Sequence, residues 1–140
     1  MILSLKHAGK RVQECDEFEF MKQEATRYGK ATERSHGIRM ELKALKECSR
    51  ERLPVYVELY TNGIKVLSRP YRPGGWEKDG PSFVYEKVRL KAGEYKALIR
   101  MRDSGIVEGF DYTFEKEIEF KSRQVVGIDF DEIRKGFYVR

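Results

Sequence analysis

The sequence predicts a mainly β protein, an antiparallel β-sandwich with a helical insertion near its N-terminus. Residues 83–101 alternate apolar and charged side chains on both sides of a loop at 91–94, the pattern of a β-hairpin, with Glu86 the exception on the apolar face. Asn62-Gly63, the dipeptide that type I′ turns favour, separates two further alternating runs. Residues 110–120 alternate apolar and acidic side chains. We expect this acidic face to complement the basic face of the 83–101 hairpin in one sheet.

The N-terminal third has a different organisation. Residues 1–9 form the first strand, with Leu3, Leu5 and His7 on one side. Residues 10–53 form a helical and loop insert, because apolar residues recur at helical spacing after Asp16. Within it, residues 38–48 fit a helix better than a strand by propensity alone.

Pro54 ends the insert, since a proline cannot continue a helix. Residues 54–140 then form the antiparallel sandwich, closed by strands at 124–130 and 136–139. All 140 residues are expected to belong to a single domain, a length that buries a core without metal or disulfide.

The charges are numerous and mixed. The net charge is +5 and the pI about 9.2, yet acidic residues interrupt nearly every basic run. A solvated mixed-charge surface is therefore favoured over a nucleic-acid interface. The nucleic-acid alternative would use the basic face of the hairpin, namely Lys87, Arg89, Lys96 and Arg100.

No apolar run approaches the roughly 20 residues that cross a bilayer, and no signal peptide is evident. Two interpretations remain open. The chain is either a complete cytoplasmic protein or a protein trimmed of an upstream export signal or anchor.

Cys15 and Cys48 are the only cysteines, and both flank the helical insert. A disulfide between them and two independent thiols are equally compatible with the sequence. A soft-metal or haem site would use Cys15, Cys48, His7 and Met40, but no spacing motif joins these residues. The sequence contains no catalytic signature, so neither an enzymatic activity nor a cofactor is expected.

A proline- and glycine-rich loop at 68–81 surrounds Trp76. The indole is either a ligand-stacking platform or a cover over the end of the core, and we favour the cover. Together with Arg72, Asp79 and Asp103, Trp76 forms the predicted ligand or partner surface.

Three motifs resemble the PEGA-type and related transthyretin-like or immunoglobulin-like accessory domains. These motifs are the Asn62-Gly63 hairpin, the run 88–95 (VRLKAGEY) and the closing run 123–130 (RQVVGIDF). The resemblance spans about residues 54–130 and implies an immunoglobulin-like or transthyretin-like sandwich. The sequence departs from the pattern by having Ala92 where proline is usual and by its long 68–82 loop.

A second resemblance is to a family of uncharacterised bacterial proteins that carry one membrane anchor and an exported sandwich domain. It rests on residues 7–11, Cys15, 48–52, 79–82 and 102–112. It implies a Cys15–Cys48 disulfide, a periplasmic or envelope location and a membrane tether. The hypothesis is a non-enzymatic domain that binds a partner protein or assembles a complex in the bacterial envelope. A metal- or haem-handling protein and a cytoplasmic nucleic-acid binder are the alternatives.

Overall fold

The computed structural model describes residues 1–13 and 49–140. The chain divides into two compact units. One comprises Met1–Lys10 and Arg52–Arg140, and the other comprises Arg11–Glu51. The predicted helices, Cys15, Met40 and Cys48 lie outside the described residues.

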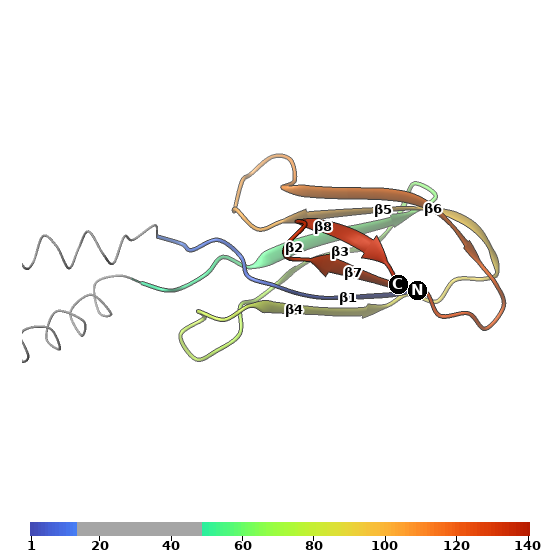
Figure 1. Cartoon of the computed structure of the whole chain (residues 1–140). Coiled ribbons are helices and arrows are strands. Elements are labelled where there is room, and N and C mark those ends of the chain that lie inside the picture. The colour runs from blue at the N-terminus through green and yellow to red at the C-terminus, as the bar shows by residue number, and fades with distance from the viewer. Residues whose placement is uncertain (14–48) are drawn as a thin grey trace, which may run out of the picture. The chain divides into compact units, whose positions relative to one another are not determined.

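The first unit contains eight strands in two four-stranded sheets (Figure 1). One sheet has the order β4-β1-β7-β8 and the other the order β3-β2-β5-β6. The strands are β1 (Ile2–His7), β2 (Val55–Thr61), β3 (Ile64–Tyr71), β4 (Ser82–Lys87), β5 (Gly93–Arg102), β6 (Tyr112–Phe120), β7 (Gly127–Asp131) and β8 (Gly136–Val139). The mainly β prediction is confirmed.

One hydrophobic core fills the space between the sheets. Leu3 of β1, Leu59 of β2, Ile99 of β5 and Ile128 of β7 are completely buried. Each follows the two-residue period that places alternate side chains on the inner face. The predicted grouping of Leu3, Leu5 and His7 on one side of the first strand is confirmed, and this side is the buried one.

The Asn62-Gly63 hairpin is confirmed. Both residues have positive φ, 50° and 79°, as a type I′ turn requires. The predicted Thr61–Ile64 pair is present, but a bulge between Leu59 and Tyr60 shifts the register beyond it. Leu59 therefore lies opposite Leu67 instead of Val66.

The predicted hairpin over residues 83–101 is wrong. Its first half, β4, pairs with β1, while its second half, β5, pairs with β2 and β6 in the other sheet. The connection at 88–92 crosses from one sheet to the other at the end where the chain termini lie (Figure 1). Alternation determines which face of a strand is buried but not which strand it pairs with. The same pattern therefore fits a β4–β5 hairpin and two strands in different sheets.

The predicted purely antiparallel arrangement needs a second correction, because β1 pairs with β7 in parallel. The predicted neighbours β5 and β6 do pair, and Lys96 of β5 lies 2.8 Å from the Glu115 carboxylate of β6. Glu86, the exception on the apolar face, sits on the edge strand β4. There it contacts Arg69 and accepts a hydrogen bond from the Tyr71 hydroxyl at 2.7 Å. Within the described ranges, no helix is long and apolar enough to cross a membrane.

Candidate binding groove

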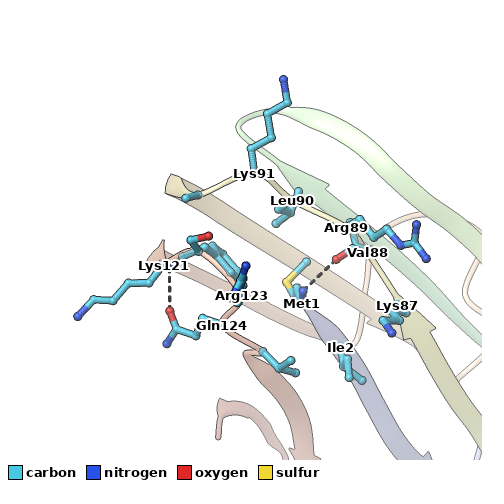
Figure 2. Close-up of a pocket in the computed structure, with 14 residues that line it drawn as sticks. Met1, Ile2, Lys87, Val88, Arg89, Leu90, Lys91, Lys121, Arg123 and Gln124 are labelled. Atoms are coloured by element: carbon cyan, nitrogen blue, oxygen red, sulfur yellow. Dashed lines mark hydrogen bonds between the residues drawn. The ribbon is translucent and has the colours of Figure 1, made fainter.

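A groove of about 520 Å³ lies at the end of the first unit, beside Met1. Its walls are the connection between β4 and β5 and the turn between β6 and β7. Backbone bonds fix its shape. The Met1 nitrogen donates to the Val88 carbonyl and the Val88 amide donates back to the Met1 carbonyl, both at 2.9 Å (Figure 2).

The groove combines an apolar floor with a basic rim. The apolar residues are Met1, Ile2, Val88, Leu90, Ala92, Phe120 and Val125. The cations are Lys87, Arg89 and Lys91 on one wall and Lys121 and Arg123 on the other. None of the 14 residues that line the groove is acidic. Figure 2 shows Met1 between the 88–91 segment and Arg123, while Lys91 and Lys121 extend away from it.

The turn that carries Arg123 is held in a strained conformation. The Lys121 amide donates to the Gln124 side-chain oxygen at 2.9 Å, and the Gln124 amide donates to the Lys121 carbonyl at 3.1 Å. Arg123 has a φ of 63°, a left-handed conformation that side chains rarely adopt. The turn thus holds a cation at the groove at a cost in backbone strain.

The five groove cations differ from the cations of this unit that form ion pairs. Lys65 and Arg100 bind Glu58, Lys135 binds Glu132, and Arg140 binds Asp129. None of the groove cations forms an ion pair within residues 1–13 and 49–140. Burial and the neighbouring Lys87 charge also lower the pKa of the Met1 amino group. The groove is therefore a concentrated positive field above an apolar floor.

His7, a predicted metal ligand, is instead buried between two carboxylates at the opposite end of the strands. It is only 2% exposed. Its Nε2 lies 2.6 Å from Asp103 and its Nδ1 lies 2.5 Å from Glu132. Both ring nitrogens are engaged, so neither is free to act as a base or to bind a metal.

Asp103, predicted to belong to the ligand surface, is also buried, and it accepts a second hydrogen bond from the Tyr112 hydroxyl at 3.3 Å. Among the residues described, no group of three His, Cys, Asp or Glu side chains is arranged to hold a metal. Cys15, Cys48 and Met40 lie outside those residues, so the disulfide stays a prediction.

Trp76 is completely exposed, so its predicted role as a cover over the core is wrong. Its loop is nevertheless ordered, since the Gly74 amide donates to the Pro81 carbonyl and the Gly80 amide donates back to Gly74. The Asp79 carbonyl accepts a hydrogen bond from Arg52 at 2.9 Å, and Arg72 is exposed. The loop between β3 and β4, which carries these residues, lies at the end away from the two chain termini (Figure 1).

The four cations proposed for nucleic-acid binding are divided by the topology. Lys87 and Arg89 line the groove. Lys96 and Arg100 lie in the other sheet, where Glu115 and Glu58 bind them. They do not form one basic surface.

Sequence reasoning missed the groove as a unit, because Lys121 and Arg123 follow Lys91 by about thirty positions. The available signal was the spacing of Lys87, Arg89 and Lys91. These cations recur at every second residue, as on one face of a strand, and no acidic residue lies between them. Comparison with protein-family models, curated proteins and solved structures finds no match to this chain.

Proposed function

We propose that this chain is a non-enzymatic binding domain whose basic groove binds an acidic segment of a partner protein. The observation that supports this most is the set of five cations around an apolar floor, with no acidic residue in the lining. Carboxylates of the partner would meet the rim while apolar side chains cover Val88 and Leu90.

Charge complementarity of this kind mainly accelerates association and selects against basic partners. The groove cations form no ion pair with described residues, so a ligand needs to displace no internal partner from them. The apolar floor supplies contact area that a small anion would leave uncovered.

A protein partner is favoured over a nucleic acid. Nucleic-acid interfaces use an extended row of cations together with exposed aromatic rings for stacking. Here the rim is short, and the one aromatic ring in the groove lining, Phe120, is buried, while the exposed rings of Phe83 and Tyr85 lie on β4 outside the groove.

The two facing sheets are compatible with the immunoglobulin-like or transthyretin-like sandwich that the sequence resembles, and we include that architecture in the proposal. With it we propose an envelope location, a membrane tether and a Cys15–Cys48 disulfide. A count of titratable thiols on the oxidised protein tests the disulfide, and two free thiols would rule it out.

The groove is tested by fluorescence anisotropy with a labelled eight-residue peptide that alternates Glu and Val. We expect binding that weakens several-fold between about 50 and 300 mM salt, because exposed charges are screened. Arg123→Glu should weaken binding about tenfold.

The matched control is Lys116→Glu, which makes the same change in net charge at an exposed residue of β6, outside the groove. Equal losses for the two variants would show a non-specific charge effect and contradict the proposal. Tighter binding of a single-stranded oligonucleotide than of the peptide would favour the nucleic-acid alternative.

A further inference from the structure

The edge strand β4 offers unpaired backbone groups next to the groove. It is the outer strand of the sheet β4-β1-β7-β8 and pairs only with β1 among the described strands. An unpaired edge is a template for an added strand.

The hydrogen-bond pattern identifies which β4 groups face outward. Val88 and Met1 exchange both backbone bonds, so they form a hydrogen-bonded pair. In an antiparallel ladder such pairs alternate with non-hydrogen-bonded ones, whose amide and carbonyl groups point away from each other. The register places Phe83, Tyr85 and Lys87 in the second class, so their backbone groups face away from β1. An isolated antiparallel bridge between Ser82 and Pro73 occupies the start of this edge, and Tyr85 and Lys87 lie on its free part.

The side chains of these residues form one outer row. Phe83 and Tyr85 are 65% and 66% exposed. Lys87 continues the row, and Arg89 follows at the groove at the same two-residue spacing. The row is thus aromatic at one end and basic at the other.

The other three edges carry features that discourage strand addition. Edge strand β3 contains Pro70 and a bulge, β6 places Lys116 among its inward positions, and β8 has only four residues. Strand β4 contains no proline and no bulge, and its inward Glu86 is bound by Arg69 and Tyr71.

We propose that the free edge of β4 and its extension to Arg89 take an additional β-strand from an acidic segment of the partner. The proposal rests on the proposed function and specifies how the groove ligand is held. Apolar residues of the added strand would lie beside Phe83 and Tyr85, and acidic residues beside Lys87 and Arg89. A second copy of the chain fits less well, because it would double the positive charge along the edge.

The test compares the Glu/Val peptide with a version that is N-methylated at alternate residues. The charges and side chains stay the same, but the donors needed for strand pairing are lost. Loss of two backbone hydrogen bonds of about 1 kcal/mol each should weaken binding about tenfold or more. Equal binding of the two peptides would overturn strand addition and leave groove binding intact, whereas no binding of either would overturn both.

A protein-side test uses Tyr85→Pro, which removes an outward amide without removing a bond to β1. The control Tyr85→Thr loses the same ring and keeps the amide. We expect about a threefold to tenfold loss of affinity for the proline variant relative to the threonine variant. Circular dichroism verifies that both variants fold. If the proline variant does not fold, the methylated peptide alone tests strand addition. A concentration-dependent dimer that Tyr85→Pro abolishes would identify a second copy as the occupant and overturn the acidic partner.

Discussion

His7 shows how a buried histidine is satisfied without a metal. Its two nitrogens lie within hydrogen-bonding distance of the Asp103 and Glu132 carboxyl groups, at 2.6 and 2.5 Å. A ring edge contact with Phe130, at 4.9 Å between centroids, fixes the ring orientation. The cluster joins the ends of β1, β5 and β7 and stabilises the fold at the end away from the groove.

Asp111 holds the loop that follows β5. Its carboxylate accepts hydrogen bonds from the Asp103 amide at 2.8 Å and from the Ser104 amide at 3.1 Å, as well as from the Ser104 hydroxyl. Burial acts to raise the pKa of Asp111, but these hydrogen bonds outweigh it and lower the pKa below its ordinary value.

The lowered pKa predicts a loss of stability in acid. A carboxyl group with a lower pKa in the folded state stabilises the fold above its unfolded pKa, near 4, and this contribution disappears as the pH falls through the folded value. Asp111→Asn should therefore lower the free energy of unfolding by about 1–2 kcal/mol at pH 7 and by much less at pH 3. Urea denaturation at the two pH values measures this. A difference that is independent of pH would show that the ionised form has no special role.

At the scale of elements, the 121–124 turn holds the charged residue Arg123 in a backbone conformation that lowers the stability of the fold. Arg123 adopts a left-handed backbone conformation that glycine tolerates better. Arg123→Gly should raise the free energy of unfolding by up to about 1 kcal/mol while weakening peptide binding. Arg123→Asn is the matched control, since asparagine tolerates the same φ and also lacks the charge. Thermal unfolding and anisotropy measure the two effects, and a destabilised glycine variant would contradict the strain argument.

Local patterns in the sequence predicted most strands but not all their partners. Asn62-Gly63 determines its own hairpin, because the turn needs two positive φ values and the dipeptide supplies them. The 88–92 connection holds no such turn signal, so alternation alone assigned β4 to β5. Glu86 was the sequence signal against a central β4–β5 hairpin, since a carboxylate on the inner face of a strand indicates an edge strand.

The candidate site was less predictable than the fold for a related reason. Lys91 and Arg123 line the same groove because Gly93, at the start of β5, pairs with Phe120, at the end of β6. That placement depends on long-range pairing, which no local motif encodes. The same holds for His7 and Asp103, which lie 96 positions apart.

At the scale of the whole molecule, the described hydrophobic core belongs to the first unit. Among the described residues, 1–13 and 49–140, every buried apolar side chain belongs to this unit, Met1–Lys10 and Arg52–Arg140. The Leu53 amide donates to the Lys10 carbonyl at 2.8 Å, so the chain leaves this unit and re-enters it at neighbouring positions. A short turn can therefore join them, and a shorter loop loses less entropy when it closes.

Replacing residues 11–51 with a linker of about four Gly and Ser residues should leave a protein that unfolds cooperatively and binds the Glu/Val peptide with unchanged affinity. Its free energy of unfolding should rise by up to about 2 kcal/mol, because the loop-closure term grows with the logarithm of loop length and the linker is about tenfold shorter than residues 11–51. Urea denaturation followed by circular dichroism measures the stability, and anisotropy measures the affinity. A matched deletion that also removes Gly9, Lys10, Arg52 and Leu53 should be less stable, because it removes the hydrogen bonds that Lys10 makes to Asp103 and Leu53 and that Arg52 makes to Asp79. Loss of cooperative unfolding in the first variant would show that the two units fold only together.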